Sequence, residues 1–150
     1  MQLTGSHILN APPSKVWELL MNTDILARIV PGITRLEQTG ENQYKAIAEI
    51  KLGPVSGSFS GSLSLSNIQP EAGYTLHVKQ NSKIGNADAE ITINLKEADN
   101  QQTELSFDGD AKLSGLLART GQRVLSGVAN TLTKQFFENF EEELSQNAAS

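Results

Sequence analysis

The chain has 150 residues, a net charge of −5 and an apolar fraction of 38%, values typical of one soluble globular domain. Its Lys and Arg residues are scattered, which argues against the basic stripe that nucleic-acid binding requires. It contains no cysteine, which excludes disulfides, thiolate catalysis and thiolate metal sites. The first residues lack the charged and apolar regions typical of a signal peptide, and no apolar stretch of about 18 residues occurs in the sequence. We therefore expect a cytoplasmic protein that meets a membrane only peripherally, at its inner face, or through a partner.

The first 30 residues predict one strand and two short helices. Residues 3–10 predict the strand. An apolar face between Val16 and Leu20 predicts a helix that begins at Pro13, because proline suits the first turn of a helix. Thr23 and Asp24 predict the capped start of the second helix.

Six further strands follow, and the segments between them contain Gly, Pro, Asn and Asp, which are typical of hairpin turns. The predicted strands cover residues 33–38, 44–52, 55–68, 74–80, 86–96 and 103–113. Consecutive strands joined by short turns should pair antiparallel. Apolar residues recur at every second position, so one face of this sheet should be dry and the other should face water.

The segment from Val55 to Ser66 carries the strongest signal, because every second residue in it is serine. The alternate row contains Gly57 and Gly61 among large apolar residues. A glycine inside a strand often marks a bend or room for another group. Neighbouring dry rows also mix large residues with alanine or glycine, as at Ala89. These rows predict a sheet that curves around a space instead of a fully packed core.

Residues 114–145 predict one long C-terminal helix with an apolar stripe that leaves Phe137 outside it. The stripe comprises Leu117, Val124, Leu125, Val128, Leu132, Phe136, Phe140 and Leu144. A helix of about 30 residues is roughly 45 Å long, so it must cross the whole domain. The sequence thus predicts an α+β helix-grip fold: a curved antiparallel sheet of about seven strands wrapped around a long C-terminal helix, with two short helices after the first strand.

No arrangement of residues predicts catalysis or a metal site. His77 alternates with Leu76 and Val78 and should face water, and His7 has no partner at metal-ligand spacing. The strand carboxylates alternate with the apolar rows and should also point outward, whereas a general acid needs a partly buried site. We therefore assign no catalytic residue and no metal ligand.

Arg119 and Arg123 stand one turn apart early in the final helix, with Gly121 between them. Two interpretations remain open. Both arginines are ordinary surface charges, or Gly121 opens space beneath the helix while an arginine contacts a polar ligand head or a partner. A glycine inside a helix costs about 1 kcal/mol relative to alanine, so its presence calls for a reason.

Four segments, in order along essentially the whole chain, carry a resemblance to a known family. They are Pro12-Pro13-Ser14-Lys15-Val16-Trp17, then Val30-Pro31-Gly32, then Leu52-Gly53-Pro54-Val55-Ser56-Gly57-Ser58-Phe59-Ser60-Gly61, and finally Gly121-Gln122-Arg123 followed by Phe136-Phe137. On these segments the chain resembles the CoxG family of carbon monoxide dehydrogenase subunits, which is part of the START-like, or SRPBCC, superfamily. Relatives often have cysteine directly after the Pro-Gly pair, where this chain has Ile33.

The resemblance implies a single START-like domain over residues 1–150 that acts beside a carbon monoxide dehydrogenase-type molybdenum hydroxylase. Its role would be in maturation, membrane recruitment or electron transfer. It also implies a lipophilic ligand, such as a quinone, between the sheet and the final helix, and no other cofactor. The expected ligand-contacting residues are Leu26, Ile29, Phe59, Gly61, Leu63, Ala89, Ile91, Phe107, Leu117, Gly121, Val124, Val128 and Leu132. Two alternatives stay open: a polyketide cyclase or hydrolase that uses the same pocket, and a structural adaptor without a ligand.

Overall fold

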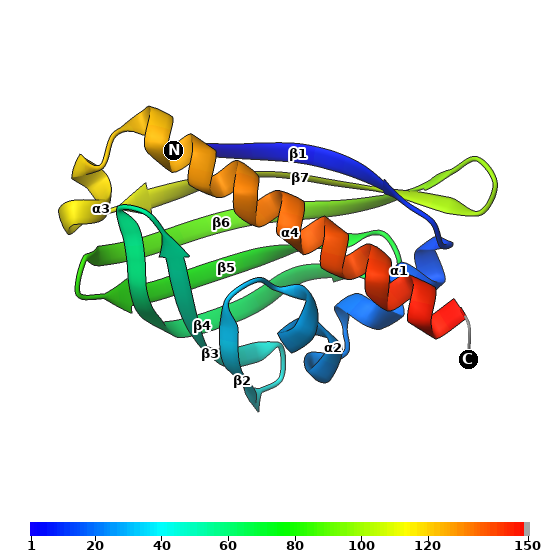
Figure 1. Cartoon of the computed structure of the whole chain (residues 1–150). Coiled ribbons are helices and arrows are strands. Elements are labelled where there is room, and N and C mark those ends of the chain that lie inside the picture. Colours follow the sequence, from blue (N-terminus) through cyan, green and yellow to red (C-terminus); the bar gives the residue numbers. More distant parts are fainter. Residues whose placement is uncertain (149–150) are drawn as a thin grey trace.

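The computed structural model describes residues 1–148, and the side chains of residues 1–146. In chain order its elements are β1 (Gln2–Leu9), α1 (Pro13–Leu20), α2 (Thr23–Ile29), β2 (Ile33–Gly40), β3 (Gln43–Leu52), β4 (Val55–Gln69), β5 (Gly73–Ser82), β6 (Gly85–Ala98), β7 (Gln102–Leu113), α3 (Gly115–Arg119) and α4 (Gln122–Ala148). The strands form one curved sheet, and α4 crosses its inner face diagonally (Figure 1). The predicted helix-grip architecture is confirmed.

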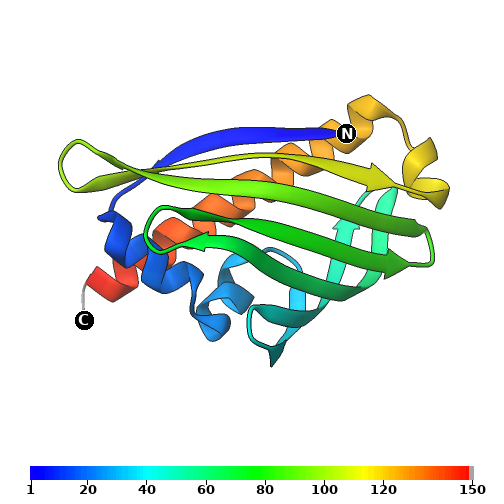
Figure 2. The same cartoon turned by 180° about the vertical axis from the view of Figure 1, so that it is seen from behind.

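The sheet has the order β1-β7-β6-β5-β4-β3-β2, and all neighbouring strands are antiparallel. Every predicted strand is present, with ends that differ from the prediction by at most two residues. The view from behind shows that the helices all lie on the inner side of the sheet and leave its outer face uncovered (Figure 2). This explains the serine row of β4, because alternate positions of a strand face water.

The start of α2 differs from the prediction by one residue. Thr23 is already helical, and Asn22 caps the helix because its Oδ1 accepts a hydrogen bond from the backbone N–H of Ile25 at 3.2 Å. Asparagine suits this role because its short side chain reaches the free N–H groups of the first turn.

The predicted single C-terminal helix is wrong, because the chain forms two helices here. Gly121 has a φ of +101°, in the left-handed region that ends a helix and that glycine tolerates without strain. α3 therefore stops at Arg119, and α4 leaves at a different angle (Figure 1). The backbone N–H of Leu117 donates to the carbonyl of Ile84 at 2.8 Å, which fixes α3 to the turn between β5 and β6. Gly121 is a helix break and does not open space beneath a helix.

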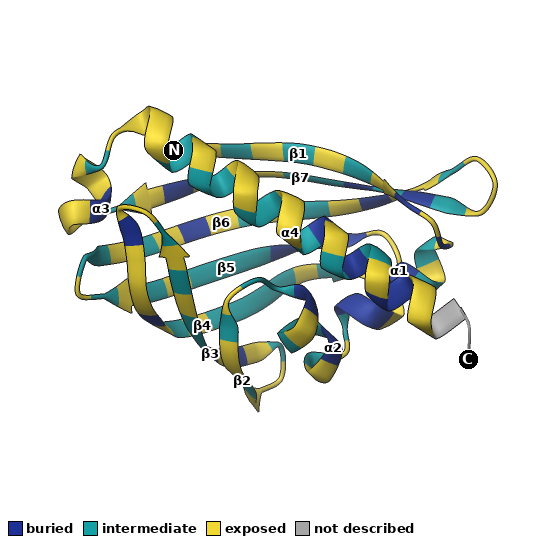
Figure 3. Cartoon of the chain, viewed as in Figure 1, coloured by how far each residue is buried: buried dark blue, intermediate teal, exposed yellow. Residues whose placement is uncertain are grey.

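Packing changes sharply along α4. No side chain from Gln122 to Phe136 is buried, whereas Phe137, Phe140 and Leu144 are buried against α1, α2 and the end of the sheet (Figure 3). The prediction that Phe137 lies off the apolar stripe is wrong. Its ring stacks on His7 of β1 at 4.6 Å, because this end of α4 is covered on more than one side. The molecule thus has a packed end and, along the first half of α4, a loosely packed one.

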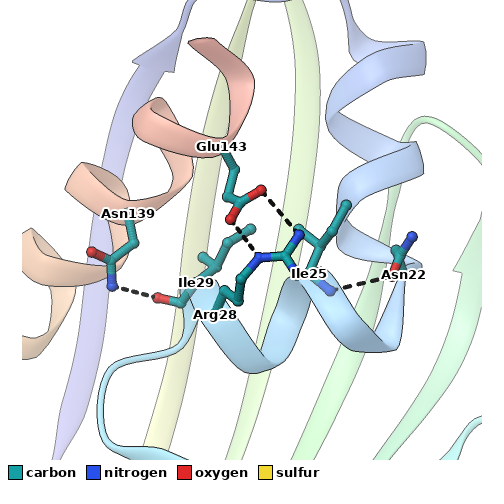
Figure 4. A network of polar contacts seen from close by, with 6 residues as sticks. All are labelled: Asn22, Ile25, Arg28, Ile29, Asn139 and Glu143. Carbon is teal, nitrogen blue, oxygen red and sulfur yellow. Dashed lines mark hydrogen bonds and ion pairs between the residues drawn. The ribbon is translucent and has the colours of Figure 1, made fainter. Parts of the chain in front are cut away.

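Polar contacts attach α2 to the packed end of α4 (Figure 4). The guanidinium of Arg28 donates to both carboxylate oxygens of Glu143, at 2.7 and 3.3 Å. The side-chain amide of Asn139 donates to the carbonyl of Ile29 at 3.0 Å. These contacts fix the segment after α2, which borders the cavity described below.

The burial of Tyr74 makes the free energy of unfolding depend on pH in the alkaline range. Its side chain is buried edge-on against Trp17, and burial, with a smaller contribution from Tyr44, raises the pKa of the Tyr74 hydroxyl. The unfolded chain loses this proton near pH 10 while the folded chain keeps it, so stability present below pH 10 is lost as the pH rises further. We expect a loss of about 1.4 kcal/mol by pH 11.

Urea unfolding of the wild type and Tyr74→Phe at pH 9 and pH 11 tests this. The difference between the two free energies of unfolding should shrink by that amount at pH 11. If the free energies of unfolding of the two proteins change equally between pH 9 and pH 11, the prediction is wrong.

Candidate functional site

A cavity of about 390 Å³ lies between the inner face of the sheet and the first half of α4. Strands β3 to β7, with Leu3 of β1 and Ile33 of β2, supply its floor, and Leu125, Val128 and Leu132 of α4 supply its roof. Leu117 of α3 borders it, as do Val30 and Pro31, which follow α2. The cavity therefore occupies the loosely packed half of the molecule.

Small side chains keep this region open. The sheet presents Ala46, Ala48, Ala87 and Ala111 to the cavity, and α4 presents Ala129. Two packed clusters flank them: one around Val55, Phe59 and Leu117, which also line the cavity, and the other under the second half of α4. A helix held at both ends by large side chains cannot settle onto the alanines between them, so the space remains.

A second cavity of about 270 Å³ adjoins the first. Val30, Pro31, Leu76 and Leu132 line both cavities, so the two share a wall. A smaller hollow of about 100 Å³ lies under Leu26 and Leu36. Together they extend the apolar space from α3 toward α1 and α2.

The chemistry of the main cavity is almost entirely apolar. Within the described part of the chain, no Asp, Glu, His, Lys, Arg or Tyr side chain lines it, and Gln80 is its one polar side chain. The terminal amine of Met1, at one edge, is bound to the carbonyl of Ala111 at 2.8 Å. An apolar pocket with few polar groups suits a lipophilic small molecule.

Seven of the predicted contact residues line the main cavity or the adjoining cavity of about 270 Å³. The main cavity has Phe59, Leu63, Leu117, Val128 and Leu132 in its wall, and the second has Ile91, Phe107 and again Leu132. An eighth, Leu26, lines the smallest hollow. The alternation of the strands and the apolar stripe of the helix are the signals that located them.

Other predicted residues lie elsewhere. Ile29 is fully buried in the packed core, Val124 is 39% exposed, and Ala89 is buried beside the cavity without lining it. Arg119 and Arg123 are exposed at the break between α3 and α4 and line none of the three cavities described above. Val124 turns outward because α4 restarts after the break, which shifts the helical face away from the predicted stripe.

Gly61 does not leave room for a ligand, contrary to the prediction. A Cβ on Gly61 would overlap the carbonyl oxygen of Lys79 and lie 2.8 Å from its carbonyl carbon. The backbone of β5 occupies this space because the sheet coils tightly between β4 and β5. The glycine permits the curvature of the sheet, and the alanines provide the volume.

Sequence reasoning missed Gln80, although the signal for it was present. Gln80 follows Tyr74, Leu76 and Val78 at every second position of β5, so it belongs to the dry row. A polar residue in an apolar row indicates a polar group that faces the interior. The alanines of β3 and α4 were missed as cavity residues because the spacing of apolar residues does not show whether they face packed side chains or empty space.

Neither histidine lines the three apolar cavities described above. His77 faces the outer side of the sheet, as predicted, where it borders a more polar hollow of about 340 Å³ with Ser62, Ser64 and Lys79. His7 was expected to be a solvated structural histidine; its side chain is 40% exposed, and its Nε2 lies 3.1 Å from Oε1 of Glu141. Over residues 1–148 the structure holds no cluster of three metal-ligating side chains. None of the described helices is long and apolar enough to span a membrane.

Comparison with known proteins agrees with this architecture. The profile of the CoxG family, described as a subunit of carbon monoxide dehydrogenase, matches residues 5–145. A conserved protein from Geobacillus kaustophilus is similar over 97% of this chain and 96% of its own, with a TM-score of 0.94 and 32% identity. No curated protein sequence matches.

More distant structures share the fold. A START superfamily protein from Mycobacterium smegmatis has a TM-score of 0.72 and 10% identity, with 97% of both chains covered. The Zhui aromatase/cyclase from Streptomyces sp. R1128 has a TM-score of 0.70 and 14% identity, over 99% of this chain and 95% of its own. At these identities the similarity shows a common fold and nothing further.

Proposed function

The chain belongs to the CoxG family of carbon monoxide dehydrogenase subunits, and we propose that it is a non-enzymatic carrier of a lipophilic small molecule. The observation that carries this proposal is the cavity of about 390 Å³ under α4, with its apolar wall. A cavity of this kind costs stability unless something fills it, because its wall lacks contacts on one side. A carrier gains from such a space, since the ligand supplies the missing contacts.

The family name supports a partner as well as a ligand. We propose that the carrier serves a carbon monoxide dehydrogenase-type molybdenum hydroxylase, in its maturation, its recruitment to the membrane or its electron transfer. A quinone suits the electron-transfer role because its ring can be reduced and reoxidised, and its apolar tail suits the wall of the cavity. The exposed Arg119 and Arg123 beside α3 offer a polar surface for such a partner.

An enzyme of the cyclase type is the alternative that the shared fold suggests. Acid–base catalysis requires an ionisable group within hydrogen-bond reach of the substrate. The described wall of the main cavity offers only the neutral amide of Gln80 and the terminal amine of Met1, which is already bound. This favours a carrier over an enzyme.

Solvent extraction of the natively purified protein, followed by mass spectrometry, tests the proposal. We expect a lipophilic compound in an amount close to one equivalent, and far less from an equal quantity of an Ala111→Leu variant, whose larger side chain enters the cavity. Extracts of both proteins that match a buffer blank, even after incubation with a membrane lipid fraction, would contradict the carrier role and favour an adaptor.

A further inference from the structure

Gln80 is an unusual residue for the wall of an apolar cavity. Its Oε1 and Nε2 are both buried, and neither has a hydrogen-bond partner among the described residues. Gln80 lines the main cavity, whose other lining side chains are apolar. Buried polar groups in native proteins are nearly always paired, so an unpaired amide requires an explanation.

The sheet around Gln80 explains why no neighbour pairs with it. Its cross-strand neighbours are Gly61 on β4 and Ala87 on β6, which carry no polar side-chain atom and little bulk. On the same face of β5 its neighbours are Val78 and Ser82, and the Ser82 hydroxyl already donates to the carbonyl of Gly85 at 2.6 Å. The side chain of Gln80 therefore lines the cavity without a polar side-chain neighbour, while its two amide atoms are covered by the surrounding protein.

A side-chain amide offers one acceptor oxygen and two donor hydrogens. In an apolar wall it cannot stabilise a charge, because burying an ion without a counter-charge is very costly. It suits a neutral group that accepts, or both accepts and donates, a hydrogen bond. An entirely apolar molecule in the cavity would leave both atoms of the amide unpaired.

We propose that Gln80 is the polar recognition point of the cavity. The ligand is then a lipophilic molecule with a neutral carbonyl, hydroxyl or amide group that binds the Gln80 side chain. This assignment rests on the proposed carrier function and specifies the chemical class of the cargo. Gln80 fixes the orientation of that cargo, with its polar group toward β5 and its apolar part under α4.

Displacement of the neutral fluorophore N-phenyl-1-naphthylamine by three chain-matched compounds tests the assignment. Tridecane carries no polar group, 2-tridecanone carries a hydrogen-bond acceptor, and dodecanamide carries both an acceptor and donors. Each is titrated against the wild type, Gln80→Leu, and the control Gln135→Leu, which makes the same change on the exposed side of α4. For each compound, the affinity for a variant is divided by the affinity for the wild type. This ratio does not depend on the solubility of the compound.

We expect Gln80→Leu to weaken the binding of dodecanamide about five- to tenfold and the binding of 2-tridecanone about threefold. These are the effects of losing two and one neutral hydrogen bonds. Tridecane should bind equally well or better, and Gln135→Leu should change none of the affinities. The melting temperature of Gln80→Leu should equal or exceed that of the wild type, since the variant removes an unpaired buried group.

If all three compounds displace the fluorophore and Gln80→Leu changes the affinities for all three equally, the assignment of Gln80 fails while the carrier function stands. If neither the fluorophore nor any compound binds the wild type, the carrier function and the assignment fail together.

Discussion

Replacing Gly61 with alanine is expected to lower the free energy of unfolding by about 3 kcal/mol, the upper end of the usual cost of overpacking. The added Cβ would lie 2.8 Å from the carbonyl carbon of Lys79 and overlap its oxygen. A flexible side chain could move aside, but here the obstacle is the backbone of β5. β4 and β5 must separate, which weakens the ladder between Ser60 and Asn81 and flattens the floor of the cavity.

Gly127→Ala is the matched control. Gly127 lies on the exposed side of α4, and a Cβ there meets nothing within 4 Å. The same substitution should therefore stabilise the protein by about 0.5–1 kcal/mol, because alanine favours helix more than glycine does. Urea unfolding of both variants measures the two effects. A Gly61→Ala protein within about 0.5 kcal/mol of the wild type would show that β4 and β5 are not so close.

The strands could be predicted almost to the residue because two signals agree in this chain. Apolar residues alternate along each strand, and Gly, Pro, Asn or Asp marks each turn. The C-terminal helix was harder, since its apolar stripe continues across Gly121. Only the backbone shows that this glycine has a φ of +101° and ends α3. A single glycine in a periodic pattern fits a tolerated helix position and a break equally well.

The cavity wall could be predicted only in part, for a related reason. Alternation indicates which residues face inward, and it located Phe59, Leu63 and Ile91. It does not indicate how close the opposite surface lies. Gly61 and Ala111 share the pattern of a small residue in a dry row, yet the backbone of β5 blocks the first and the second borders the cavity. Distances between strands and helices arise from packing, which a sequence pattern does not contain.

Ala111→Leu is expected to abolish most binding of a lipophilic probe while leaving the fold intact. Ala111 on β7 lines the main cavity directly, and leucine there adds three carbons to the space under α4. In a hollow core these atoms gain apolar contacts, so stability should be unchanged or higher. In a packed core they would force neighbours from their rotamers and cost about 1–3 kcal/mol. Ala72→Leu, at the exposed turn before β5, makes the same change away from the cavity and serves as the control.

Titration of wild-type, Ala111→Leu and Ala72→Leu proteins with N-phenyl-1-naphthylamine, with a thermal melt of each, tests most directly whether the space under α4 holds a lipophilic molecule. We expect saturable binding of one probe per wild-type chain, at least tenfold weaker binding to Ala111→Leu, and no change for Ala72→Leu. The melting temperature of Ala111→Leu should not fall. Equal probe affinity in all three proteins, together with a clear drop in the melting temperature of Ala111→Leu, would contradict the carrier account.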